Sequence, residues 1–185
     1  MIFIPNLITL ARFALVPLLL VLLQDKQYVF SLAVFFVAGV SDALDGYLAK
    51  RFNAVTWLGS LLDPLADKVL LMSSYYMLAY LELIPFWLSV VVIFRDLVIV
   101  GGYLILALFY DATNIQPSRI SKLNTFLQIS FILLVLAALS YNLSIALLIS
   151  SLAVLVLITS VTSCVDYVVR GSKVSMQMTE SDRHR

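Results

Sequence analysis

Charged residues are scarce in this sequence of 185 residues: Asp, Glu, Lys and Arg together make up 12% of it. Soluble domains carry about 25% charged residues. Here 62% of the residues are apolar, and the mean hydropathy is +1.03. This composition excludes an ordinary soluble domain and predicts an integral membrane protein surrounded by the lipid bilayer.

The low net charge and the single cysteine exclude further classes of protein. The formal net charge is only +1, so there is no broad basic face for nucleic acid and no nucleic-acid partner is expected. The single cysteine, Cys164, excludes an internal disulfide. The first residues lack the charged start and cleavage site of a signal peptide and the Arg-rich character of a transit peptide. We therefore expect them to form the first membrane span.

Long apolar runs take up most of the chain. A backbone in lipid must satisfy its own hydrogen bonds, and these runs are continuous rather than alternating, which favours helices over barrel strands. We expect one membrane domain, residues 1–170, followed by a polar, disordered tail, residues 171–185. The predicted fold is an all-α bundle of six transmembrane helices at residues 5–24, 28–49, 60–81, 84–110, 120–140 and 143–169.

The positive charges indicate the orientation of the bundle. Lys and Arg near the ends of spans are retained on the cytoplasmic side of a membrane. With the N-terminus inside, the outer loops hold Lys26, and we expect both termini in the cytoplasm. The basic residues then expected near cytoplasmic span ends are Arg12, Lys50, Arg51, Lys68, Arg119, Lys122, Arg170 and Lys173.

Four carboxylates lie in two stretches at the ends of neighbouring apolar runs, SDALDGYLAK and GSLLDPLADK. Asp42 and Asp45 are three residues apart and Asp63 and Asp67 are four apart, so each pair shares one helix face. Because the two predicted helices are antiparallel and joined by a short loop, we expect both pairs in one cytoplasmic-side pocket. Close carboxylates require cations, and their oxygens suit Mg²⁺, Mn²⁺ or Ca²⁺. Two Mg²⁺ ions about 4 Å apart would clamp a phosphate under attack.

The residues around these carboxylates fit a phosphate-containing ligand. Gly46 and Gly59 remove side chains where a bulky group must approach the backbone. Lys50 adds positive charge at the depth of anionic headgroups. Pro64 is consistent with a helix that begins or kinks beside Asp63, although an aspartate before a proline also suits a simple helix cap.

The pattern Asp42-x-x-Asp45-Gly46-x-x-Ala49-Lys50, followed after eight residues by Gly59-x-x-x-Asp63-x-x-x-Asp67, resembles the signature of the CDP-alcohol phosphotransferases. One position departs, because the family usually has Arg where this chain has Lys50, which lacks the Arg fork. The stretch IPNLITLARFALVP is similar to the family's N-terminal span. FRDLVIVGGYL and QPSRISKLNTFLQ resemble segments of the eukaryotic-type cardiolipin synthases, and less closely of the phosphatidylglycerophosphate synthases.

The resemblance implies a six-helix enzyme, commonly a homodimer, in the bacterial cytoplasmic membrane with its active site facing the cytoplasm. It implies transfer of a phosphatidyl group from CDP-diacylglycerol to an alcohol with release of CMP. Phosphatidylglycerol, giving cardiolipin, is the favoured acceptor, and glycerol 3-phosphate is the alternative. Asp67 would be the general base and, with Asp42, Asp45 and Asp63, a ligand of two Mg²⁺ or Mn²⁺ ions. The nucleotide site would comprise Asn6, Thr9, Gly46, Ala49, Lys50 and Gly59, and the acceptor site Arg95, Arg119 and Lys122.

Other interpretations stay open for the basic residues. Arg95 is followed by Asp96, so the two also suit a structural ion pair inside the bundle. Arg119 and Lys122 also suit topology signals with no further role.

Two other function classes stay open. A membrane prenyltransferase also uses Asp-rich, Mg²⁺-bound diphosphate sites. It would carry two well-separated Asp-rich motifs and usually more spans, whereas one cluster is found here. A cation or proton transporter would place carboxylates near the membrane midplane within repeated halves. Here they lie at predicted cytoplasmic ends, and the sequence shows no internal repeat.

Overall fold

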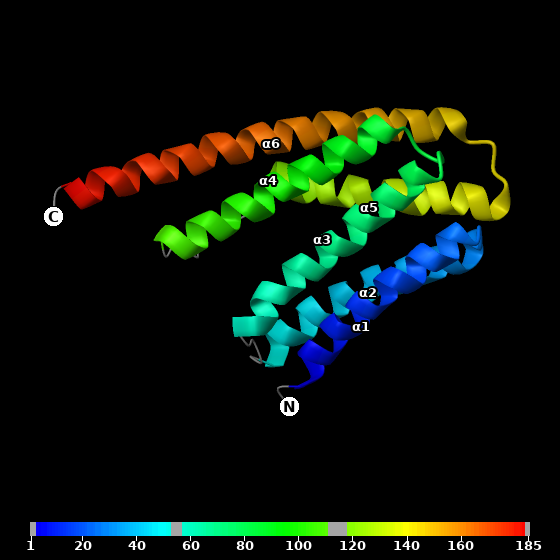
Figure 1. Ribbon diagram of the computed structural model, residues 1–185, viewed down its shortest axis with the longest axis horizontal. Helices are drawn as coiled ribbons and strands as arrows, with labels where there is room; N and C mark the ends of the chain where they lie inside the picture. Colours follow the sequence, from blue (N-terminus) through cyan, green and yellow to red (C-terminus); the bar gives the residue numbers. More distant parts are fainter. Residues whose placement is uncertain (1–2, 53–56, 111–117, 184–185) are drawn as a thin grey trace.

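The computed structural model describes the backbone of residues 3–52, 57–110 and 118–183, and the side chains of residues 13–41, 68–102 and 118–170. Over these residues the chain is all-α, as predicted, and the boundaries differ from the predicted ones by a few residues except at the end of the last helix. The six helices are α1 (Phe3–Gln24), α2 (Tyr28–Phe52), α3 (Trp57–Tyr80), α4 (Phe86–Tyr110), α5 (Arg119–Tyr141) and α6 (Ala146–Arg183), shown in Figure 1.

The last helix extends further than the sequence predicted. α6 continues through residues 171–183, where we expected a disordered tail. This segment contains no proline, the residue that most strongly ends a helix, so the helical backbone can continue into it. The domain boundary at residue 170 stays a prediction.

Two helices have the length and apolar composition of membrane spans in the part of the chain that the structure describes. Within the described residues, Arg119–Tyr141 and Ala146–Arg170 are long and apolar enough to cross a membrane, and Phe13–Gln24 and Tyr28–Ser41 are shorter apolar stretches. Many large apolar side chains face outward, as Phe94 does with 63% exposure. Such a surface is unfavourable in water and suits a bundle surrounded by lipid.

Successive helices run in opposite directions (Figure 1). The short turns at residues 25–27, 81–85 and 142–145 lie at one end of the bundle. The beginnings of α1, α3 and α5 and the ends of α2, α4 and α6 lie away from these turns. We call this the signature end, since the signature residues of α2 and α3 lie there.

The three short turns share one backbone arrangement. Each contains a residue with positive φ just after its helix: Lys26 (58°), Glu82 (58°) and Asn142 (51°). The next residue donates its backbone N–H to the carbonyl five positions earlier, which is the Schellman arrangement that closes a helix end. The donor and acceptor pairs are Gln27 and Leu22, Leu83 and Leu78, and Leu143 and Ala138.

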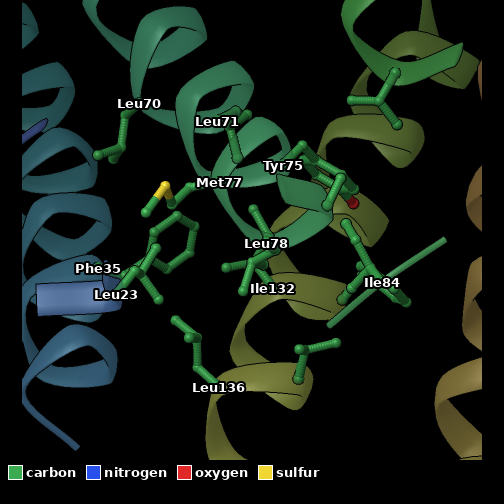
Figure 2. Packing of buried hydrophobic residues seen from close by; sticks show 14 of the residues in the cluster. Leu23, Phe35, Leu70, Leu71, Tyr75, Met77, Leu78, Ile84, Ile132 and Leu136 are labelled. Carbon is green, nitrogen blue, oxygen red and sulfur yellow. The ribbon is translucent and has the colours of Figure 1, made fainter. Parts of the chain in front are cut away.

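The apolar core takes residues from all six helices, most of them from α1, α3 and α5, and Figure 2 shows part of it. Tyr75 of α3 stacks on Phe131 of α5, with ring centroids 5.9 Å apart. α1 packs against both α2 and α3, α3 packs against α4, and α6 packs against α4 and α5. α1 is therefore a common neighbour of the two helices that carry the signature.

Candidate active site

The four predicted metal ligands lie on α2 and α3, which follow one another in the chain. Asp42 and Asp45 are near the end of α2, and Asp63 and Asp67 are in the first half of α3. The backbone is helical at all four positions, so the members of each pair share a helix face. Their side chains lie outside the described residues, and the meeting of the two pairs in one pocket stays a prediction.

The start of α3 tests the alternative that Asp63 is only a helix cap. α3 begins at Trp57, well before Asp63, so Asp63 is not the residue that caps this helix. Pro64 lies within α3 rather than at its start. Since proline has no N–H, it cannot donate to the carbonyl of Ser60, as a residue at this point of a helix otherwise would.

The residues predicted to contact the nucleotide fall on the same part of the bundle. Figure 1 shows the beginning of α1 near the end of α2, and these two helices pack together. The side chains of these residues lie outside the described ranges, and their roles stay predictions. They are Asn6 and Thr9 on α1, Gly46, Ala49 and Lys50 on α2, and Gly59 on α3.

Arg95 of α4 is the centre of a buried ionic network. The residue is 1% exposed, and its neighbour Asp96 is 0% exposed. Arg95 Nη1 donates to Asp96 Oδ1. Arg95 Nη2 donates to the Oγ of Ser121 on α5 at 2.6 Å and to the Oγ of Ser163 on α6 at 2.7 Å. This one guanidinium therefore connects α4, α5 and α6.

Lys68 of α3 joins the same network. Its Nζ lies 2.9 Å from Asp96 Oδ1, and its side chain is 18% exposed. Within the part of the chain that the structure describes, Arg95 Nε and Asp96 Oδ2 are buried without a hydrogen-bond partner. The network thus connects α3 to α4 at Lys68, the residue that follows Asp67. One buried donor and one buried acceptor of the network have no hydrogen-bond partner among the described residues.

The three predicted acceptor-binding residues lie in different surroundings. Arg95 makes the structural ion pair that the sequence left open for it, and its acceptor role stays a prediction. Arg119 and Lys122 are exposed at the beginning of α5. That helix is capped by Ser118, whose Oγ accepts from the backbone N–H of Ser121 at 3.1 Å.

Sequence reasoning missed three members of the network. Lys68 was assigned only to topology, although its place directly after a predicted metal ligand was a usable signal. Ser121 and Ser163 carried no signal, because a serine in an apolar run most often bonds within its own helix. Among the described residues, no group of three or more His, Cys, Asp or Glu side chains gathers for a metal. The predicted metal site therefore rests on residues 42–67.

A family model gives an independent comparison. The model for CDP-alcohol phosphatidyltransferase matches residues 2–164, which include α1 to α5 and the first half of α6. The chain belongs to this family. CDP-alcohol phosphatidyltransferases are integral membrane proteins, generally metal-dependent, and transfer substituted phosphate groups. The resemblance carried by the signature is therefore confirmed.

Individual relatives carry three different names. Cardiolipin synthase (CMP-forming) of Rattus norvegicus is 36% identical over 155 residues, which cover 75% of this chain and 51% of that protein. CDP-diacylglycerol--glycerol-3-phosphate 3-phosphatidyltransferase of Bacillus subtilis is 34% identical over 140 residues, 68% of this chain and 72% of that protein. A probable phosphatidylglycerophosphate synthase of Mycobacterium tuberculosis is 33% identical over 173 residues, which cover 90% of this chain and 80% of that protein. The chain spans about half the length of the animal cardiolipin synthases that it matches.

Proposed function

We propose that this chain moves the phosphatidyl group of CDP-diacylglycerol to phosphatidylglycerol, which yields cardiolipin and releases CMP. The observation that carries the proposal is the set of four carboxylates at the family's spacing, near the end of α2 and in the first half of α3. The likeness to cardiolipin synthases from rat and human over 155 residues supports this choice of product.

The four carboxylates are proposed to hold two Mg²⁺ or Mn²⁺ ions. Asp42, Asp45, Asp63 and Asp67 supply oxygen donors, and the signature from residue 42 to residue 67 contains no His, Cys or Met. This donor set fits hard divalent cations and suits zinc or copper poorly. When bound, the ions would neutralise negative charge on the diphosphate of the donor lipid.

Asp67 is proposed to act as the general base. The acceptor's hydroxyl oxygen forms a bond to the phosphorus of the phosphatidyl group, the bond from that phosphorus to the bridging oxygen breaks, and CMP leaves with that oxygen. The hydroxyl proton passes to the Asp67 carboxylate. The residues proposed to line the nucleotide site are Asn6, Thr9, Gly46, Ala49, Lys50 and Gly59.

The basic residues support a lipid acceptor. Glycerol 3-phosphate is a small dianion that requires a dense cationic pocket. Arg95 is buried, and its two terminal nitrogens already donate to a carboxylate and two serines. Its Nε, which has no partner among the described residues, remains for an acceptor oxygen. Together with the exposed Arg119 and Lys122, this is a modest set of donors that suits the single charge of a phosphodiester.

CMP release by the detergent-purified protein tests the proposal. The protein is given CDP-diacylglycerol and Mg²⁺, with phosphatidylglycerol in one reaction and glycerol 3-phosphate in a second. We expect CMP and cardiolipin in the first reaction, and EDTA should prevent the formation of these two products. If folded protein releases no CMP in either reaction, with Mg²⁺ or with Mn²⁺, the proposal is wrong.

Phosphatidylglycerophosphate synthase is the second candidate. It is favoured by the Bacillus subtilis relative, which is named for glycerol 3-phosphate and of which this chain covers 72%. CMP release with glycerol 3-phosphate alone would establish this activity in place of the first.

We also propose that both termini and the signature end face the cytoplasm of a bacterial cytoplasmic membrane. Support comes from Arg119 and Lys122 at the signature end, opposite the turn that holds Lys26. Single cysteines at Lys26→Cys or Arg119→Cys, in a Cys164→Ser background, test the orientation. In intact cells, an impermeant thiol reagent should label the first variant, and the reverse pattern would contradict the orientation.

A homodimer is proposed from the family resemblance. After subtraction of the detergent, the purified protein should then have twice the 20.6 kDa mass of one chain. The mass of a single chain would contradict this assembly.

The other function classes have less support. A prenyltransferase or a cation or proton transporter also uses membrane carboxylates, but membership of the CDP-alcohol phosphatidyltransferase family favours phosphatidyl transfer.

A further inference from the structure

A salt bridge joins α3 to α4 directly after Asp67. Lys68 Nζ lies 2.9 Å from Asp96 Oδ1. We propose that Lys68 and Asp96 are positioning residues that set the rotation of α3 about its axis, and with it the direction in which the face carrying Asp63 and Asp67 is turned. This inference rests on the proposed function, since it takes those two carboxylates as metal ligands.

Lys68 lies on the face of α3 that packs into the bundle. Lys68, Leu71, Tyr75 and Leu78 are three or four residues apart, a spacing that places them on one helix face. Leu71 is 4% exposed, and Tyr75 and Leu78 are 0% exposed. Asp67 precedes Lys68 by one residue, so the two positions lie about 100° apart around the helix axis. A tether at Lys68 therefore limits how far the Asp67 position can rotate.

Asp96 is held firmly enough to serve as the anchor of this tether. Arg95 Nη1 donates to the same oxygen that Lys68 contacts, and Arg95 is itself held by Ser121 and Ser163. Asp96 is completely buried, and interactions between charges are weakly screened away from water. Movement of this carboxylate away from α3 would break its contact with Lys68.

The charges of the network make Lys68 the residue to change. Asp96 contacts two cations, so Lys68→Met leaves Arg95 and Asp96 paired with each other. A change at Asp96 would instead remove the carboxylate from both cations and endanger the fold. Lys68→Met therefore removes the tether and preserves the rest of the network.

Binding of Mn²⁺ tests this role without turnover. Free Mn²⁺ is measured by electron paramagnetic resonance with the purified full chain. We expect Lys68→Met to weaken Mn²⁺ binding about tenfold, the size of effect seen when a residue that orients metal ligands is removed. Lys68→Arg keeps a cation at this position and should restore most of the affinity.

The matched control is Arg170→Met, which removes an exposed cation from α6. It should leave Mn²⁺ binding unchanged. The midpoint of thermal unfolding is measured for every variant. A merely structural role for Lys68 would lower this midpoint and leave the Mn²⁺ affinity of the folded protein as it was.

The outcomes separate this inference from the proposed function. If the unaltered protein and folded Lys68→Met bind Mn²⁺ equally well, the positioning role is wrong and the metal site stands. If the unaltered protein binds no Mn²⁺, both the metal site and this inference are wrong. If Lys68→Met does not fold, Lys68→Gln, which retains a hydrogen-bond donor, is judged by the same outcomes.

Discussion

Gly102 of α4 lies directly against the ring of Tyr167 of α6. A Cβ at position 102 would lie 2.7 Å from both Cε1 and the hydroxyl oxygen of Tyr167, closer than real Cβ contacts come. The missing side chain therefore allows α4 and α6 to approach here, as small residues do between membrane helices.

Gly102→Ala should destabilise the protein, because the added methyl group forces the Tyr167 ring to move. We expect a loss of about 1 kcal/mol in the free energy of unfolding, at the low end of the range for overpacking, because the end of the Tyr167 side chain can shift. The neighbouring Gly101 is the matched control, since a Cβ there meets nothing within 4 Å among the described residues. Gly101→Ala should be neutral or stabilising by up to about 1 kcal/mol, because Ala is the better helix former.

Unfolding of the two variants in a mixed-detergent titration measures this difference. Equal stability of Gly101→Ala and Gly102→Ala would contradict the close approach at Tyr167. Shortening the opposing side chain in Gly102→Ala with Tyr167→Leu should recover part of the loss.

Asp96→Asn should be more destabilising than Arg95→Met. Asp96 is the carboxylate that Arg95 and Lys68 both contact. Its neutralisation leaves both cations without a negatively charged partner in this network and should lower the free energy of unfolding by about 3–5 kcal/mol. Arg95→Met still leaves Lys68 paired with Asp96. The midpoint of thermal unfolding checks the order, and Arg170→Met, at an exposed pair on α6, should show no measurable change. The reverse order would mean that the serine contacts of Arg95 outweigh the ion pairs.

Two buried amides one turn apart on α5 should respond differently to apolar substitution of similar size. Asn124 Oδ1 accepts from the hydroxyls of Thr159 at 2.8 Å and Ser160 at 2.9 Å. Both side-chain polar atoms of Gln128 are buried without a partner among the described residues. Asn124→Leu should cost about 1 kcal/mol, since interhelical hydrogen bonds in membranes average about 0.6 kcal/mol each.

Gln128→Met should be neutral or stabilising, because it removes polar atoms that are buried without hydrogen bonds. The free energy of unfolding in detergent measures both changes. A loss for Gln128→Met as large as that for Asn124→Leu would indicate that Gln128 has a partner, such as a bound water.

Arg119→Gln with Lys122→Gln should raise the KM for the acceptor and leave the thermal midpoint unchanged. Both residues are exposed, so the fold does not depend on their burial. We expect about a tenfold rise in KM, since a hydrogen bond to a charged group contributes about 1.5–3 kcal/mol and exposure reduces it. An unchanged KM would mean that Arg119 and Lys122 do not bind the acceptor and serve only as topology signals. Arg170→Gln, which removes another exposed cation, is the control.

Asp67→Asn should leave the protein folded and lower CMP release at least about 10²-fold, because asparagine keeps the shape of the side chain and cannot accept the proton. The matched control is Asp25→Asn, at an exposed carboxylate in the turn between α1 and α2. Turnover that survives in Asp67→Asn would remove the assignment of Asp67 as the base.

Much of the fold was readable from the order of apolar and polar residues. α1 ends at Gln24 and α2 begins at Tyr28, as predicted, because the polar residues 25–27 interrupt two apolar runs. The continuation of α6 to Arg183 was missed. Hydropathy indicates where a helix leaves an apolar environment, whereas the helix itself ends only where its backbone hydrogen bonds end.

The candidate site also has one part that the sequence predicted and one part that it did not. The spacing of Asp42, Asp45, Asp63 and Asp67 is local and was legible in the sequence. Arg95 could be assigned either to an acceptor or to an ion pair, and nothing local decided between them. The structure shows the ion pair with Asp96 and adds contacts with Ser121 and Ser163, which lie on two other helices.

The sequence by itself determined the apolar environment, the positions of the helices and the family, because these depend on composition and on spacing within a few turns. Only the tertiary structure decided that Lys68 meets Asp96 and that Gly102 receives Tyr167. Such contacts depend on how each helix is rotated and where it crosses its neighbours. Those quantities follow from the packing of all six helices together, and no local stretch of sequence specifies them.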